Sequence, residues 1–346
     1  CYTDESFFRR EIENIFLRRW QFVGHRDQIA QPGEYLCYDG LGGSLIVICH
    51  SDGEIKAFAN SCRHRGARLL SHNGICRRIT CPYHGWVYGL DGSLIRAPGM
   101  ESTANFNSAD FPLLEFPVAT WDGLIFISYE RNPSPLTEQL GNMPQKFHSH
   151  RTGEMKFVGS LEFEIRSNWK LLVENALEAY HTGSVHRDTL GQQVSRPIEC
   201  SAQWTGLLVE DENSVATLVG DAKPFPHIEG LDNEAKTGAY FTVLFPATQL
   251  VFAQDCMWWL AFQPVSVDRT TLTLGACFPE ATVARDDFGE KAALYFNRWK
   301  TATAEDNQIC EQQQHGQSFT SREPGRFASS EFAVHRFANW IVDQMD

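Results

Sequence analysis

The chain lacks three features that would assign it to a common class of protein. No stretch approaches the roughly 18 consecutive apolar residues of a membrane-spanning helix, and no basic segment followed by an apolar one marks a secretory signal. No G-x-G-x-x-G turn follows a predicted strand, so we expect the chain not to bind a nicotinamide dinucleotide itself. With 30 lysines and arginines against 43 aspartates and glutamates, the net charge of −13 argues against a nucleic-acid-binding surface.

A disulfide framework is also lacking, although the chain contains ten cysteines. Most of them are scattered, often inside apolar stretches such as residues 45–49. This pattern is typical of buried free thiols in a reducing compartment, so we expect no disulfides and a cytoplasmic location. Because the chain begins at Cys1 rather than at a methionine, we expect a short leader to precede it.

Two short segments each pair one cysteine with one histidine. Cys62-x-His64 is followed, after sixteen residues, by Cys81-x-x-His84, and a glycine comes soon after each histidine. Two thiolates and two imidazoles are the ligands of a Rieske [2Fe–2S] cluster, in which two cysteines bind one iron and two histidines the other. A structural zinc site uses the same residue types, but here each loop can give one ligand to each iron, which favours the cluster.

Two histidines in the second half of the chain suit a different metal. His181 and His186 follow a predicted helix over residues 169–180, and Glu174, Glu178 and His181 share one face of it. Two imidazoles and one carboxylate form the facial triad of non-haem Fe(II), which leaves positions open for O2 and substrate. Taken alone, the pair fits one core and one surface histidine better than a metal site. The Cys/His motif changes this interpretation in favour of a metal site. A Rieske cluster delivers electrons one at a time, and an O2-activating iron needs electrons delivered in this way.

The texture of the sequence predicts an α+β protein with two domains. Glycine turns separate short β-rich runs over residues 34–96, which is typical of a small antiparallel domain. We place this all-β cluster domain at residues 21–150, ending in a proline-rich polar region. The catalytic domain follows at residues 151–346.

For the catalytic domain we predict an antiparallel sheet packed against long helices. One strand is expected over residues 157–165, and further strands are expected between residues 214 and 278, beginning with residues 214–219. A long helix follows over about residues 286–314, with a break near Thr303.

Both motifs resemble those of one enzyme family. Cys-x-His…Cys-Pro-Tyr-His-Gly-Trp at residues 62–86 and Asn-Trp-Lys…Glu-x-Tyr-His…His at residues 168–186 are similar to the oxygenase component (α subunit) of the Rieske non-haem iron oxygenases. The resemblance covers nearly the whole chain. It implies a helix-grip (START-like) catalytic domain, with the helix of residues 1–20 packed on it, and it implies that His181 and His186 bind the iron.

The resemblance places the third iron ligand on a late helix, as an aspartate with Glu or Gln soon after. Asp306 fits that pattern, and the rival candidates are Asp255, Asp286 and Asp287. Asp286 and Asp287 lie near a predicted helix start, where acids are favoured as caps and by the helix dipole. We therefore predict Asp306 as the third ligand.

Two polar residues before His181 receive roles as well. Glu178 matches an acidic residue that, in the family, connects a Rieske histidine of a neighbouring subunit to an iron-binding histidine. Asn175, almost one turn earlier, either lines the iron pocket or only satisfies backbone groups. The inter-subunit role implies a head-to-tail ring, commonly a homotrimer, and leaves the presence of a β subunit open.

The two centres together predict the terminal oxygenase of a multicomponent system. It would use O2 and electrons from NAD(P)H, delivered by a separate flavin or iron–sulfur reductase, with or without a ferredoxin. The first expectation is hydroxylation or oxidative demethylation of a small aromatic compound, as in aromatic hydrocarbon catabolism. The alternative is N-demethylation or monooxygenation of a quaternary ammonium compound of the betaine, carnitine or choline type, because the late Glu-Asp…Cys-Glu arrangement resembles members acting on these.

The aromatic residues do not separate the two substrates. Phe245, Phe252 and Trp258 are expected in the pocket, as a cation–π cage or as an apolar slot for a ring. Two non-enzymatic interpretations also stay open, an electron-transfer protein and a zinc-stabilised ligand-binding protein. The roughly 190 residues after the domain boundary argue against the first, because they suffice for a whole further domain.

Overall fold

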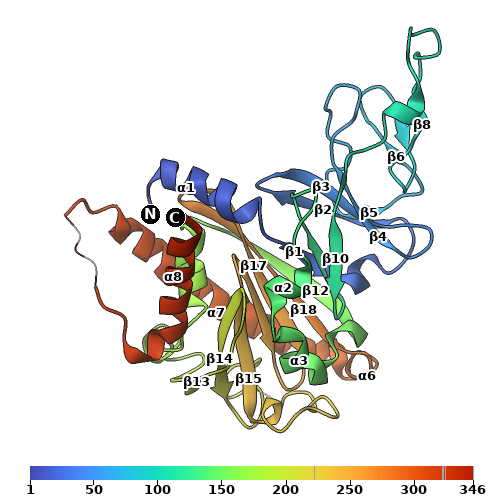
Figure 1. Ribbon diagram of the computed structural model, residues 1–346. Helices are drawn as coiled ribbons and strands as arrows, with labels where there is room; N and C mark the ends of the chain where they lie inside the picture. Colours follow the sequence, from blue (N-terminus) through green and yellow to red (C-terminus); the bar gives the residue numbers. More distant parts are fainter. Residues whose placement is uncertain (222, 322, 324, 346) are drawn as a thin grey trace. The chain divides into compact units, whose positions relative to one another are not determined.

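The computed structural model describes residues 1–221, 223–321, 323 and 325–345, which Figure 1 traces. The chain forms two compact units: Phe16–Ser134 is the smaller, and Cys1–Ile15 together with the chain from Pro135 onward is the larger. Among the described residues, no helix has both the length and the apolar character needed to cross a bilayer. All ten cysteines have free thiols.

The smaller unit consists of antiparallel strands, as the turn-rich sequence predicts. They form sheets with the orders β1-β11-β10, β5-β2-β3-β4-β9 and β6-β7-β8. The elements are β1 (Gln21–His25), η2 (Arg26–Ile29), β2 (Glu34–Gly40), β3 (Gly43–Cys49), β4 (Ile55–Ala59), β5 (Gly74–Ile75), β6 (Ile79–Thr80), β7 (Val87–Tyr88), β8 (Leu94–Arg96), η3 (Ser108–Asp110), β9 (Glu115–Phe116), β10 (Val118–Trp121) and β11 (Leu124–Ile127).

Strand β3 separates two hydrophobic cores in this unit. Successive side chains of a strand point to opposite faces, and the last five residues of β3 are all buried. Ile46 and Ile48 therefore pack in the core that contains Cys62 and Cys81, whereas Val47 packs in the other core. The cysteines of the predicted cluster are thus anchored in a hydrophobic core rather than in a mobile loop.

The larger unit is built on a seven-stranded antiparallel sheet with the order β12-β18-β17-β16-β15-β14-β13. Its strands are β12 (Met155–Ile165), β13 (Ser195–Pro197), β14 (Trp204–Glu210), β15 (Gly238–Leu244), β16 (Thr248–Phe252), β17 (Met257–Ser266) and β18 (Arg269–Pro279). No strand forms over residues 214–219, so this part of the strand prediction is wrong. The predicted combination of an antiparallel sheet with long helices is confirmed.

Helices cover this sheet and carry the second predicted site (Figure 1). The helix that we expect to break near Thr303 is continuous, and it packs its Trp299 against Trp258 and Phe278 of the sheet. The helical segments are α1 (Glu5–Glu11), η1 (Ile12–Phe16), α2 (Leu136–Leu140), α3 (Met143–Phe147), η4 (His148–His150), η5 (Thr152–Glu154), α4 (Trp169–Asn175), α5 (Thr182–Val185), η6 (Ala235–Thr237), α6 (Glu280–Val283), α7 (Phe288–Gln317), η7 (Ser329–Glu331) and α8 (Phe332–Met345).

The chain passes between the units earlier than the boundaries at residues 20 and 150 that we expect from the sequence. Residues 135–150 belong to the larger unit because their apolar side chains pack on its sheet. Phe147 stacks on Phe252 with ring centroids 4.2 Å apart, and it meets Trp204 and Tyr240 edge-on. The polar, proline-containing segment of residues 135–150 therefore forms two short helices, α2 and α3, that pack on the sheet of the larger unit.

A buried ion pair ties α1 to α4. The carboxylate of Glu11 and the ammonium of Lys170 are 2.5 Å apart, and the indole N–H of Trp169 donates to Glu11. Both charged groups are almost fully buried, so burial raises the pKa of Glu11 and lowers the pKa of Lys170. Such a pair holds only if both partners stay in place, and it therefore fixes the start of the chain on the larger unit.

Candidate metal centres

The two Cys/His segments of the smaller unit form loops with the same backbone closure. The amide of Cys62 donates to the carbonyl of Ala67, and the amide of Cys81 donates to that of Trp86, both at 2.8 Å. Four residues after each cysteine, a glycine adopts a positive φ, +74° in the first loop and +69° in the second. A side chain at these positions would be strained, so glycine is required for both turns.

The loops bring thiols and imidazoles to one place with different exposure. Cys62 and Cys81 are buried in one core, while His64 is half-buried and His84 is exposed. The two imidazole rings lie 4.8 Å apart, and the ring of His64 stacks on Trp86. Nδ1 of His64 is buried and has no hydrogen-bond partner among the described residues. Two buried sulfurs and two imidazoles, one with an orphaned nitrogen, fit the donor set of a Rieske cluster.

One hydroxyl group contacts the sulfur side of this site. Tyr88 Oη accepts a hydrogen bond from the amide of Arg63 at 3.0 Å and lies 3.3 Å from Sγ of Cys62. A cysteine that binds iron is deprotonated and its sulfur can only accept, so in the cluster-bound protein the hydroxyl would be the donor of this contact. Tyr88 was not predicted as a site residue, because nothing in the sequence around it indicates this contact.

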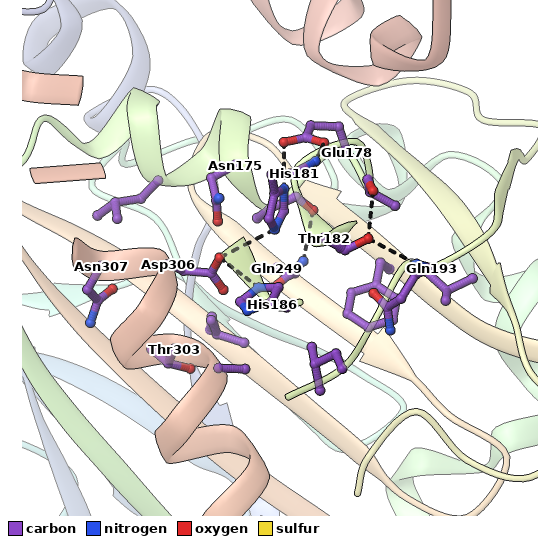
Figure 2. Close-up of a pocket in the computed structure, with 18 of the residues that line it drawn as sticks. Asn175, Glu178, His181, Thr182, His186, Gln193, Gln249, Thr303, Asp306 and Asn307 are labelled. Carbon is purple, nitrogen blue, oxygen red and sulfur yellow. Dashed lines mark hydrogen bonds and ion pairs between the residues drawn. The ribbon is translucent and has the colours of Figure 1, made fainter. Parts of the chain in front are cut away.

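The second set of predicted ligands comes together in the larger unit. Nε2 of His186 lies 3.0 Å from Oδ1 of Asp306, and Nε2 of His181 lies 3.4 Å from the same oxygen. Figure 2 shows the Asp306 carboxylate facing both rings. One ligand atom from each of the three residues lies within 4.8 Å of the others. Two imidazole nitrogens and a carboxylate oxygen are the donor set of the non-haem iron facial triad.

The local fold accounts for this convergence, although it differs from the helix that we predict over residues 169–180. Helix α4 ends at Asn175, and the chain then makes a turn before the short helix α5. His181 and His186 flank α5 as its N-cap and C-cap residues, which turns both rings toward the middle of α7. Both rings thereby face Asp306, which lies 131 positions after the end of α4 in the sequence.

Each histidine has a second carboxylate on its other ring nitrogen. Oε1 of Glu178 lies 2.6 Å from Nδ1 of His181, and Oε2 of Glu305 lies 2.7 Å from Nδ1 of His186. Glu305 also accepts a hydrogen bond from the hydroxyl of Thr189 at 2.8 Å. A carboxylate at each Nδ1 favours a proton there, so each Nε2 can offer its lone pair to a metal ion that displaces the proton shared with Asp306. The role of Glu305 was not predicted.

Electrostatics match this arrangement in the metal-free protein. Burial alone would lower the pKa of His181, but Asp306 and Glu178 raise it to about 10. Burial alone would raise the pKa of Asp306, but His181 and His186 lower it to about 2. A carboxylate this stabilised, between imidazoles that a cation would deprotonate, is suited to binding a metal ion.

The three residues line a pocket that encloses about 740 Å³, open solvent at its mouth included. Asn175 lines it, together with the aromatic residues Phe241, Trp258 and Phe262. Of the three aromatic residues predicted here, only Trp258 is present. Phe245 packs on Phe337 and Trp340 of α8, and Phe252 packs on Phe147.

The rival ligand candidates lie elsewhere. Asp255 is fully buried and accepts hydrogen bonds from the hydroxyls of Ser214 and Tyr295, and burial raises its pKa to about 6. Asp287 pairs with Arg285, and Asp286 is exposed. None of the three aspartates is among the described residues that line the pocket.

Comparison with known proteins identifies the two units. The Rieske [2Fe-2S] domain family matches residues 19–107, and the family of the ring hydroxylating alpha subunit (catalytic domain) matches residues 152–346. The chain belongs to the ring-hydroxylating alpha-subunit family. The predicted family, the α+β fold class and the enzyme class, an oxidoreductase that incorporates O2, are thereby confirmed. The cofactors of this alpha subunit are a Rieske [2Fe–2S] cluster and a mononuclear non-haem iron, and the two non-enzymatic interpretations are wrong.

Relatives of this alpha subunit include enzymes with named substrates. It is 28% identical to choline monooxygenase of Amaranthus tricolor over 349 residues, which cover 98% of this chain and 75% of that protein. It is 34% identical to the carnitine monooxygenase oxygenase subunit of Escherichia coli K12 over 188 residues, which cover 54% of this chain and 50% of that protein.

Solved structures share the fold. The quaternary ammonium Rieske monooxygenase CntA in complex with γ-butyrobetaine has a TM-score of 0.83 at 24% identity, covering 100% of this chain and 94% of that one. Naphthalene 1,2-dioxygenase from Rhodococcus has a TM-score of 0.78 at 20% identity, covering 99% and 92%. At these identities the likeness is one of fold.

Proposed function

We propose that this alpha subunit is the terminal oxygenase for a quaternary ammonium compound. The observation that carries the proposal is the match to choline monooxygenase over 98% of the chain, together with 34% identity to a carnitine monooxygenase over half of it. These relatives support the alternative drawn from the sequence better than the small aromatic substrate placed first. An aromatic pocket wall that includes Phe241 and Phe262 is compatible with a methylated ammonium group.

In this proposal Cys62, Cys81, His64 and His84 hold the cluster, which exchanges one electron at a time when it is bound. The buried cysteines keep its sulfur side out of water. The more exposed histidines supply the edge that an electron donor can approach. Tyr88 donates its hydroxyl proton to the sulfur of Cys62, which favours the reduced form.

His181, His186 and Asp306 are the proposed iron ligands, and ferrous iron bound there supplies the O2-activating centre. Glu178 and Glu305 hold the protons at Nδ1 of the two histidines, so that both Nε2 atoms can coordinate. Asn175 and the apolar pocket wall place the substrate beside this centre and exclude bulk water.

The partners in this proposal are a flavin or iron–sulfur reductase, with or without a ferredoxin, and further copies of the chain in a head-to-tail homotrimer. Glu178 is the residue that would meet a cluster histidine of the neighbouring copy, since its side chain keeps 12% exposure while bonded to His181. The cytoplasm is the proposed compartment, which ten free thiols support.

Substrate-dependent O2 uptake tests the proposed function. The holoenzyme, with a surrogate reductase and NADH, is offered choline, γ-butyrobetaine, benzoate and a methoxybenzoate. We expect uptake coupled to an oxidised product with at least one of the two ammonium compounds and with neither aromatic acid. Coupled turnover of an aromatic acid alone would reverse the assignment.

A further inference from the structure

Arg298 of α7 is a buried cation in the pocket wall. Its side chain is 6% exposed, and it lines the pocket that contains Asp306. Its guanidinium lies over the ring of Trp258, 5.6 Å from the centroid, and Nε is buried without a hydrogen-bond partner. The acids that act on its charge, Asp306 and Glu305, do so through electrostatics and not through a hydrogen bond. It is also the one lysine or arginine among the described residues that line this pocket.

This arrangement is incomplete as it stands. Burial lowers the pKa of Arg298 to about 10, so the group remains a cation at neutral pH. Buried charges in proteins are paired, because an uncompensated one costs several kcal/mol. The contact with Trp258 contributes about 2 kcal/mol, which is less than this cost, and it satisfies none of the five N–H donors. The partner must therefore come from the pocket itself.

The nearby acids do not supply that partner. Asp306 and Glu305 stabilise the charge of Arg298 from a distance, but their oxygens face His181, His186 and Thr189. A divalent cation at the triad would also cancel most of the field of Asp306 at Arg298. With iron bound, the need for an anion beside Arg298 becomes larger.

We propose that Arg298 binds a carboxylate group of the substrate, so that the enzyme acts on a small acid that carries a methylated ammonium group and not on an amino alcohol such as choline. This inference rests on the proposed function and narrows its substrate class. A guanidinium and a carboxylate form two parallel hydrogen bonds, which would satisfy the orphaned donors of Arg298 and neutralise its charge.

The charges of the pocket also give the substrate a direction. Arg298 supplies positive charge in the pocket wall, and Glu178 and Glu305 supply negative charge beside the triad, which the iron and Asp306 between them do not cancel. A zwitterion is attracted with its carboxylate at Arg298 and its methylammonium group at the triad, where the methyl carbons meet the oxidising centre. An ammonium group over Trp258 is disfavoured, because the guanidinium already lies there.

The helix sets the length of the substrate. Arg298 and Asp306 are eight residues apart on α7, so their Cα atoms are separated by about 12 Å along the helix axis. The long side chain of Arg298 can bring the guanidinium nearer to Asp306 than its Cα atom is, but a distance between the two charged groups remains. This spacing favours an acid with several bonds between the carboxylate and the ammonium nitrogen.

Two matched pairs of compounds test the inference by calorimetric binding to the anaerobic holoenzyme. The first pair is γ-butyrobetaine and butyltrimethylammonium, which lacks the carboxylate, and the second is benzoate and benzamide. In each pair that binds, we expect the acid to bind about tenfold or more tightly than its counterpart. The preference should fall to less than about threefold in Arg298→Gln and be partly kept in Arg298→Lys. Lys300→Gln, an exposed charge on the same helix, should not change it.

Equal binding within the pairs, an unchanged preference in Arg298→Gln, or no binding by either acid would overturn the inference. The comparison in the wild-type protein decides the question even if the glutamine variant does not fold. The benzoate pair separates this inference from the proposed function. If benzoate binds about tenfold more tightly than benzamide but no ammonium compound supports O2 uptake, the carboxylate site at Arg298 is supported and the proposed ammonium substrate is refuted.

Discussion

Nδ1 of His181 lies 2.6 Å from Oε1 of Glu178, while Nε2 of the same ring faces Oδ1 of Asp306 at 3.4 Å. One imidazole therefore lies between two carboxylates. The other oxygen of Glu178 accepts the backbone N–H groups of Tyr180 and His181, so the carboxylate is held by the turn that it caps. Ring orientation, tautomer and local fold are thus set by a single side chain.

Glu178→Gln tests the proposed inter-subunit role of this residue. The amide can still cap the turn, but it removes the negative charge between the histidines. We expect a folded protein with full iron content, in which oxidation of the reduced cluster during a single turnover slows by about 10- to 100-fold. Glu174→Gln, which changes an acid one turn earlier that bonds Tyr2, is the matched control and should keep the rate. Wild-type rates in Glu178→Gln would refute the role.

Glu305→Ala should weaken the iron site without unfolding it. The substitution frees Nδ1 of His186, so the ring can rotate and its tautomer is no longer fixed. We expect a 10- to 100-fold loss of Fe(II) affinity, measured by competition with a chelator, as is typical for such supporting carboxylates. Glu311→Ala is the control, because this residue of the same helix accepts the backbone amide of Arg166 and does not touch the triad among the described residues. Equal affinities for wild type and Glu305→Ala would contradict the assignment.

The pKa of His181 predicts how the stability of the metal-free protein depends on pH. Its folded value of about 10 lies above its ordinary value of 6.5. A raised folded pKa contributes stability that is fully present below pH 6.5 and is lost as the pH rises toward 10. Urea unfolding of the metal-free protein should therefore give a free energy of unfolding that declines between pH 7 and pH 9.5. In His181→Gln this decline should be smaller, and an equal decline in both proteins would show that His181 is not its source.

Tyr88→Phe should lower the reduction potential of the cluster. When Cys62 is bound to the cluster as a thiolate, the hydroxyl can only donate to its sulfur, and such bonds stabilise the more negative, reduced state. A net hydrogen bond of about 1 kcal/mol corresponds to roughly 40 mV for one electron. Redox titration followed by visible circular dichroism measures the change. Tyr83→Phe, at an exposed tyrosine beside His84, should leave the potential unchanged, and an unchanged potential in Tyr88→Phe would exclude the contact.

The ligand residues could be predicted from the sequence because their chemistry is local. Cysteine and histidine repeated at short spacings are typical of metal sites, and His181, His186 and Asp306 do converge. Glu305 was missed since adjacent residues of a helix point in different directions, and the sequence does not show that the ring of His186 reaches past Asp306. Arg298 was missed because a single arginine within a helix has the pattern of a surface charge.

The pocket wall shows where sequence patterns stop being informative. Strand β16 is buried on both faces, so its apolar residues do not alternate with polar ones. Its register pairs Val251 with Trp258, which puts these two side chains on one face and the next residue, Phe252, on the other. Only that register excludes Phe252 from the pocket. The end of α4 at Asn175 is similarly a tertiary effect, because Glu178 caps a turn where local propensity favours more helix.

The central claim is that one chain holds two iron centres of different kinds. Iron analysis of the reconstituted protein with parallel EPR tests it most directly, in the wild type and in the double variant His181→Ala/His186→Ala. We predict about three irons per chain in the wild type and about two in the double variant, with an unchanged signal of the reduced cluster and no substrate-coupled O2 uptake. Fewer than about three irons in the wild type, or productive O2 uptake by the double variant, would contradict the account.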